Sequence, residues 1–201
     1  MARHEWLGNV LDLADWRRQV SETYARVRAA ADPEVAWEIW RAEKSRLHRS
    51  HPQSPLAESR RHESLSTFAY DPAWRRVGAF APVEPTPAAS EPVPLMCVGS
   101  VSFLLPDGRQ ASLDLFWPDE YGGGLFLPFR DTTSGVSTYG GGRYLLDGAK
   151  GADLGTEEGL LVLDFNFAYH PSCVHDDRWS CPLAPPSNRL PVAVAAGERL
   201  S

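Results

Sequence analysis

The spacing of hydrophobic residues predicts helices in the first part of the chain and strands in the rest. Over residues 9–30, apolar side chains recur every three or four positions, which is the period of an amphipathic helix. A second helix is predicted over 33–48, where Asp32 can cap the first turn and Pro33 fits the first helical position. Ser54-Pro55 repeats this start and predicts a short helix over 54–61. We expect these apolar stripes to pack onto their own domain rather than to form a partner-binding surface.

Strand patterns begin after residue 65. The clearest is a hairpin, in which the alternating segments 95–105 and 110–117 flank the turn residues Pro106-Asp107-Gly108. Cys97, Gly99, Val101, Phe103 and Leu105 should share one face of it, as should Ala111, Leu113, Leu115 and Trp117. Residues 82–94 contain five prolines and are predicted to form an extended surface connector. The other predicted strands are 66–70, 75–80, 125–131, 141–146, 160–170 and 188–197.

These elements predict a single α+β domain over 1–201, with a helical region (1–64) and a β-rich core (65–201). Closely spaced strands without intervening helices favour a mostly antiparallel barrel or sandwich, with the N-terminal helices packed against it. A length of 201 residues and 43% hydrophobic residues are ordinary for such a domain.

Charge and cysteine content narrow the class of protein. The net charge is −6, and residues 81–201 hold 7 Lys/Arg against 15 Asp/Glu, which argues against a nucleic-acid-binding protein. The chain has no apolar run long enough for a signal peptide or a membrane span. Three cysteines do not suggest a secreted disulfide framework. We therefore expect a cytoplasmic protein that does not interact with membranes.

The segment 160–170 presents polar residues within an otherwise apolar strand. In an extended strand, Asp164, Asn166 and His170 would point to the same side, opposite a continuous apolar face. This row can line a pocket, or it can face solvent as one side of an antiparallel sheet often does. Because Asp and Asn are depleted from strands, we favour the pocket.

A glycine triplet, Gly140-Gly141-Gly142, lies between Tyr139 and Arg143. The glycines allow close backbone approach to a ligand, but no Lys-Ser/Thr pair follows as in a phosphate-binding loop. The Arg143 guanidinium can bind an anion through two parallel hydrogen bonds, or it can form an internal ion pair with Asp131 or Asp164.

Two histidines and two cysteines cluster between residues 170 and 181. His170, Cys173, His175 and Cys181 have donor atoms that suit zinc, but their spacing does not match a zinc knuckle. We rank buried thiols first, a redox pair second and a metal site third. A nucleophilic Cys173 activated by a neighbouring imidazole is also chemically possible.

The polar candidates suggest three functions. In the first, the chain is an enzyme acting on a polar, anionic metabolite, with Arg143 or Arg189 as the anion anchor and Asp164 with Tyr139 as acid and base. In the second, the same groups hold a small ligand without catalysis; in the third, they form an internal structural network. We expect Glu198 to act as a clasp that fixes the C-terminus. No cofactor motif is present, and the predicted partner is a small molecule. The full candidate set is Asp131, Tyr139, Arg143, Asp164, Asn166, His170, Cys173, Asn188 and Arg189.

Several motifs in a fixed order resemble a known family. They are Ser54-Pro55-Leu56, Tyr70-Asp71-Pro72-Ala73-Trp74-Arg75, Phe129-Arg130-Asp131, Thr138-Tyr139-Gly140-Gly141-Gly142-Arg143, Leu163-Asp164-Phe165-Asn166, Cys181-Pro182-Leu183, Pro185-Pro186-x-Asn188-Arg189-Leu190 and Ala196-Gly197-Glu198. Together they resemble the bacterial and archaeal family known as domain of unknown function 1684, over about residues 35–200. The resemblance implies no activity. In the family pattern, Asn usually replaces His170 and His175 is not typical, so a His/Cys metal site would be particular to this chain.

Overall fold

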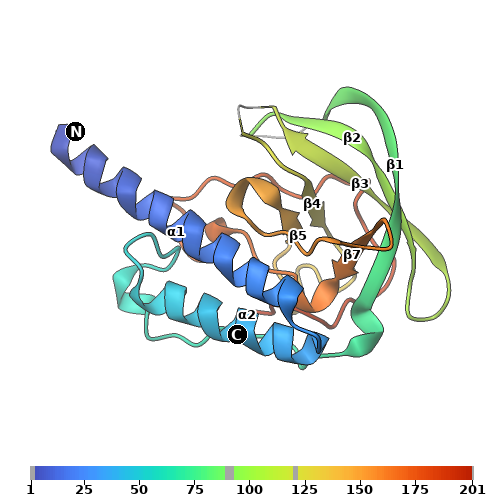
Figure 1. The fold of residues 1–201 in the computed structure, drawn as a ribbon, viewed down its shortest axis with the longest axis horizontal. Coiled ribbons are helices and arrows are strands. Elements are labelled where there is room, and N and C mark those ends of the chain that lie inside the picture. Colours follow the sequence, from blue (N-terminus) through green and yellow to red (C-terminus); the bar gives the residue numbers. More distant parts are fainter. Residues whose placement is uncertain (1–2, 89–92, 120–121, 201) are drawn as a thin grey trace.

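The computed structural model of the chain describes residues 3–88, 93–119 and 122–200, with side chains from residue 9 onward. Two helices, α1 (Arg3–Ala29) and α2 (Pro33–Ser50), precede a sheet of seven strands and lie side by side against it (Figure 1). Asp32 caps α2 as predicted, because its carboxylate accepts a hydrogen bond of 2.8 Å from the Glu34 N–H.

Much of the two predicted apolar stripes packs against the chain's own sheet. Among the described side chains of α1, the deeply buried apolar ones are Tyr24 and Val27 in its second half, whereas Leu13 is exposed. In α2 the buried stripe includes Trp37 and Trp40. These residues belong to one core with side chains from the sheet.

The strands form one antiparallel sheet that is curled into a half-barrel and is not closed (Figure 1). Its order is β5-β4-β3-β2-β1-β7-β6, and every pair of neighbours is antiparallel. The predicted α+β class is therefore confirmed. The bounds are β1 (Arg75–Ala88), β2 (Leu95–Leu104), β3 (Gln110–Pro118), β4 (Phe126–Phe129), β5 (Arg143–Asp147), β6 (Thr156–Glu157) and β7 (Leu160–Asp164).

The predicted hairpin is confirmed as β2 and β3, which pair over most of their length. One feature differs from the prediction, because Trp117 is 41% exposed. Its neighbour Phe116, on the opposite face of β3, is buried in a second, smaller apolar cluster. Both faces of the sheet therefore carry buried apolar side chains at this end. A simple alternation of apolar and polar residues does not predict this arrangement.

Three predictions in the middle of the chain are wrong. Residues 54–61 form only a single 3₁₀ turn, at Glu58–Arg60, and residues 66–70 form no strand beyond one bridge at Thr67. The proline-rich segment is not a connector throughout, because β1 continues to Ala88; residues 89–92 lie outside the described part of the chain. Beyond Gly78, β1 pairs only with β2, so its other edge carries no ladder that the prolines would break.

The predicted strand 160–170 is confirmed only in its first half, as β7, and the predicted strand 188–197 is wrong. β7 ends at Asp164, and residues 165–167 form a 3₁₀ turn because the Asp164 carboxylate accepts a 3.0 Å hydrogen bond from the Asn166 N–H. The predicted alternation of faces therefore stops at this residue. Residues 188–197 make one bridge, between Arg189 and Arg130, and otherwise run as an irregular segment across the sheet end.

A buried arginine holds the C-terminal segment in place. Arg143 is 1% exposed, and its guanidinium donates to Asp131 (2.8 Å) and to the backbone carbonyls of Val194 (2.8 Å), Ala196 and Glu198 (3.1 Å). Between these carbonyls Gly197 has φ +76°, and a Cβ there would lie 2.4 Å from a backbone oxygen. One side chain thus replaces the ladder that a strand would have supplied.

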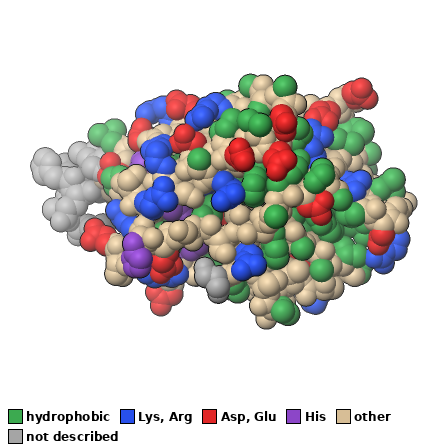
Figure 2. Space-filling model, turned by 90° about the horizontal axis from the view of Figure 1, so that it is seen from below, with side chains coloured by type: hydrophobic (Ala, Val, Ile, Leu, Met, Phe, Trp, Pro, Cys, Tyr) green, Lys and Arg blue, Asp and Glu red, His purple; other side chains and the backbone are tan. Residues whose placement is uncertain are grey.

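The face of the molecule seen in Figure 2 carries charges of both signs. Figure 2, which views the molecule from below relative to Figure 1, shows basic and acidic side chains interspersed without a single basic area. None of the described helices combines the length and the apolar composition that crossing a bilayer requires.

Replacing Arg143 tests whether this side chain holds the C-terminal segment in place. We expect Arg143→Met to lower the free energy of unfolding by roughly 3–5 kcal/mol, because it removes the cation that pairs with the buried Asp131 carboxylate and the guanidinium donor of three backbone carbonyls. The carboxylate keeps the Thr133 N–H as a donor, but its charge has no buried counterion. Arg189→Met is the matched control; this arginine is exposed, so the expected change is within about 0.5 kcal/mol. Urea unfolding measures the free energy of unfolding of both variants. An equal loss in the two variants would contradict the role of Arg143 in holding the C-terminal segment.

Candidate functional site

Most of the sequence-predicted polar residues are engaged inside the protein. Asn166 accepts from the Asp71 N–H (3.0 Å) and donates to the Asp71 carbonyl (2.9 Å) and to Asp164 (2.8 Å). Asn188 exchanges two hydrogen bonds with the Asp114 backbone (2.8 and 2.9 Å) and donates a third to the Pro128 carbonyl (2.7 Å). Each amide thus serves a neighbouring backbone segment. The interpretation as an internal network, which the sequence left open, fits these residues.

Of the two proposed anion anchors, one is engaged inside the protein and the other lies on the surface. Arg143 forms the internal ion pair with Asp131, and both side chains are sealed, with exposures of 1% and 0%. Arg189 lies on the surface, away from any enclosed space described for the chain. The structure therefore does not bring these two arginines together with Asp164 and Tyr139 in one pocket.

Asp164 lines a small polar hollow of about 170 Å³ on the β7 side of the helices. One carboxylate oxygen caps the 3₁₀ turn, and the other lies 3.9 Å from Arg75 Nε. Arg75 is itself paired with Glu157. Burial raises the pKa of the Asp164 carboxyl to about 6, against its hydrogen bonds to Asn166 and the charge of Arg75.

Tyr139, Cys173 and Cys181 lie together as a half-buried group of free thiols and a phenol. Burial, reinforced by Cys181, raises the pKa of the Cys173 thiol, which keeps it protonated at neutral pH. This is the opposite of what an activated nucleophile needs. Across the described residues, no group of three or more His, Cys, Asp or Glu side chains is arranged to hold a metal ion.

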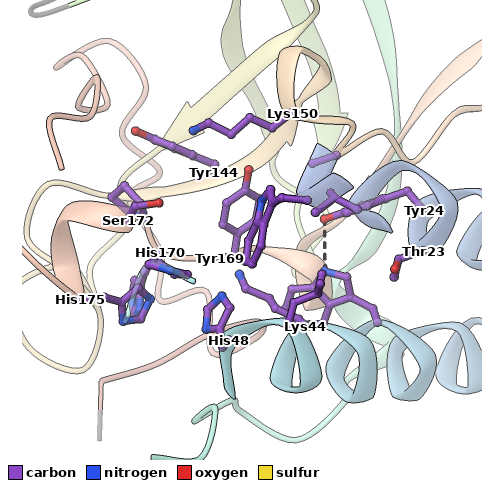
Figure 3. A pocket seen from close by; sticks show the side chains of 17 residues that line it. Thr23, Tyr24, Lys44, His48, Tyr144, Lys150, Tyr169, His170, Ser172 and His175 are labelled. Atoms are coloured by element: carbon purple, nitrogen blue, oxygen red, sulfur yellow. Dashed lines mark hydrogen bonds between the residues drawn. The ribbon is translucent and has the colours of Figure 1, made fainter. Parts of the chain in front are cut away.

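A pocket that does not include Asp164, Tyr139 or Cys173 lies between the two helices and the end of the sheet (Figure 3). It encloses about 90 Å³, enough for several water-sized groups. Its walls are mainly aromatic and aliphatic, and its charged lining residues are two lysines, with no Asp or Glu among the described side chains that line it. The lining residues are Trp16, Val20, Thr23, Tyr24, Trp40, Lys44, Leu47, His48, Pro55, Tyr144, Lys150, Ala152, Tyr169, His170, Pro171, Ser172 and His175.

Lys44 is the most buried cation of this pocket. It projects from α2 beneath the Tyr169 ring, with its ammonium 4.1 Å from the ring centroid (Figure 3). Behind it, Nζ lies 2.6 Å from an oxygen of Glu198, which is 1% exposed. The other Glu198 oxygen accepts a 2.7 Å hydrogen bond from the His170 N–H. Burial is the largest single influence on Glu198 and opposes its ionisation, but Lys44 together with His170 and His48 outweighs burial and lowers the pKa of the carboxyl to about 2.

Three neutral histidines surround this ion pair. Burial lowers the pKa of His48 to about 3 and that of His170 to about 4, and it also lowers the pKa of His175. The His170 ring is occupied, because its Nε2 accepts from the Tyr139 N–H at 3.2 Å. The rings of His48 and His175 meet edge to face, with centroids 5.4 Å apart.

Sequence reasoning identified His170 and His175 but missed Lys44, His48 and Tyr169 as pocket residues. A signal for two of them was present, because Trp37, Trp40, Lys44 and His48 follow a helical period on one face of α2. Glu198 was expected to fix the C-terminus, and it does so by pairing with Lys44.

Comparisons with known proteins show which proteins this chain resembles. The family described as "Protein of unknown function (DUF1684)" matches residues 60–199. A solution NMR structure of an uncharacterized protein from Haloarcula marismortui is 37% identical, with a TM-score of 0.62; the match covers 83% of this chain and 94% of that one. No curated protein matches the chain.

Asp164 offers a test of the electrostatics through pH. Its folded-state pKa of about 6 lies above the ordinary value of 3.8, so its protonated form stabilises the fold at low pH and this contribution is lost as pH rises through 6. Wild type should therefore lose on the order of 2 kcal/mol more stability between pH 4 and pH 7 than Asp164→Asn does. Urea unfolding of both proteins at both pH values measures this difference. The contributions of the other carboxyl groups to the pH dependence are the same in the two proteins and therefore cancel. Identical pH dependence in the two proteins would contradict the raised pKa.

Proposed function

The chain belongs to the DUF1684 family, and from this premise we propose that it binds a small amphipathic carboxylate in the pocket between its helices and its sheet. The observation that carries the proposal is the lining: aromatic and aliphatic walls, Lys44 and Lys150 as the charged groups, and no described acidic side chain on the surface of the pocket. Apolar walls with a few converging polar groups are typical of small-molecule sites.

Lys44 replaces Arg143 as the anion anchor in this proposal. An ammonium has three N–H donors. That of Lys44 is paired with Glu198 at 2.6 Å and lies 4.1 Å from the Tyr169 ring centroid and 5.3 Å from that of Trp40. Glu198 is its one ionic partner among the described residues, so we propose that a ligand carboxylate oxygen accepts from a remaining N–H. Because the surroundings are poorly solvated, a charge-assisted hydrogen bond here is stronger than one at the surface.

Lys150 contributes differently. It lies at the pocket edge, is 47% exposed in its side chain and is 3.2 Å from Asp147. Screening by solvent makes such a charge weak in holding a ligand, although it favours the approach of an anion. We therefore expect Lys44 to determine affinity and Lys150 to contribute little.

Catalysis in the same pocket is the second proposal, and the observation that favours it is the position of two imidazoles, those of His48 and His175, in the pocket wall with Lys44. Burial lowers the pKa of both imidazoles, which makes them weak proton acceptors at neutral pH. Binding needs only the contacts already described, and it is therefore the function that the geometry supports best.

Calorimetric titration with 3-phenylpropionate tests the proposal. Its ring suits the aromatic walls and its carboxylate suits Lys44. The informative variant is the double substitution Lys44→Met/Glu198→Gln, which removes both buried charges together and avoids leaving either one unpaired. We expect it to weaken binding about tenfold or more, in line with loss of a charge-assisted hydrogen bond.

Lys150→Met is the control and should change the affinity by less than about threefold. A thermal melt of each variant establishes that it is folded. No binding of 3-phenylpropionate to wild type, or equal binding to the double variant, would refute the proposal.

A further inference from the structure

The pocket adjoins a second, larger hollow. A groove of about 720 Å³ runs from the end of α2 to the C-terminal residues, and its lining includes Arg60, Ser64, Ser66 and Arg199. The pocket measures only about 90 Å³. The two spaces therefore differ in character: one is small and aromatic, and the other is wider and lined by both polar and apolar side chains.

Three side chains line both spaces. His48, His170 and His175 belong to the wall of the pocket and to the wall of the groove. Figure 3 shows these imidazoles gathered on the side of the pocket toward which the Lys44 ammonium extends. Glu198, the partner of Lys44, also lines the groove. The polar centre of the site is thus the junction between the two spaces.

Two buried atoms at this junction lack a hydrogen bond of good geometry, Glu198 Oε1 and His175 Nε2. Glu198 Oε1 still has an ion-pair partner, the Lys44 ammonium at 2.6 Å, whereas His175 Nε2 has no partner among the described residues. The rest of the residue is firmly held, because its carbonyl accepts 2.8 Å from Arg60 and its N–H donates 3.0 Å to the Ser172 carbonyl. A buried polar atom without a partner is unfavourable, so a ligand group that bonds to it gains affinity.

We propose that the ligand is a carboxylate with a polar arm, and that this arm leaves the pocket past His175 and lies in the groove. The inference rests on the proposed function and extends it. The apolar end fills the aromatic pocket, the carboxylate meets Lys44, and an amide or hydroxyl on the neighbouring carbon bonds to His175 Nε2. An N-acylated aromatic amino acid has this arrangement of groups, whereas a simple arylalkyl acid lacks the arm.

Two matched probes separate the arm from the rest of the ligand. N-acetylphenylalanine is 3-phenylpropionate with an acetamido group on the carbon next to the carboxylate. We expect wild type to bind N-acetylphenylalanine roughly tenfold more tightly in calorimetric titrations, because the arm satisfies a buried nitrogen. If wild type binds the two probes equally, the inference is overturned and the proposed function stands. If it binds neither probe, the proposed function itself fails.

Two variants locate the arm. His175→Phe keeps an aromatic ring against His48 and removes the nitrogen, and Ser64→Trp partly fills the groove from an exposed position. Each should weaken N-acetylphenylalanine about fivefold or more and change 3-phenylpropionate by less than about twofold. Val20→Trp, which narrows the pocket itself, should weaken both probes. Equal effects of the first two variants on both probes would overturn the inference.

Discussion

Two buried charges, Lys44 and Glu198, have to stay together, and their pairing fixes how α2 meets the end of the chain. Either charge alone in this environment would cost several kcal/mol, so the helix cannot shift away from the C-terminal segment without a large penalty. The backbone positions the carboxylate, because the Glu198 N–H donates 2.8 Å to the Ala168 carbonyl. This contact holds α2 against the C-terminal segment, and it places the Lys44 side chain in the wall of the pocket.

A second constraint comes from irregular backbone that must still find hydrogen-bond partners. The segments after β7 and before the C-terminus are buried but form no ladder, so side chains have to supply the missing bonds. Arg143, Asn166 and Asn188 do this at three places. Polar residues in apolar surroundings can therefore indicate an irregular core as well as a binding site.

Local patterns determined which elements sequence reasoning could find. The hairpin of β2 and β3 and the start of α2 depend on neighbouring residues, and both were predicted. The end of β7 was not, because it depends on how Asp164 turns to cap residues far from any glycine or proline. The strand continuing through Pro82 was missed because tolerance of proline depends on which edge is unpaired.

The candidate site also shows the difference between features set by neighbouring residues and features set by distant contacts. His170 lines the wall of a pocket, but the side chains that line this pocket with it come in part from α1 and α2 and could not be assigned from one segment. Lys44 looks like a surface lysine in sequence, since only the fold reveals Glu198 behind it and Tyr169 above it. Contacts between residues more than a hundred positions apart carry no local signal.

A crystal structure of the protein grown with 3-phenylpropionate tests the central claim most directly. The account predicts electron density for the ring between the helices and Tyr169, with a carboxylate oxygen within hydrogen-bonding distance of Lys44 Nζ. An empty pocket at a saturating concentration of the probe, or a probe bound only elsewhere on the molecule, would contradict it.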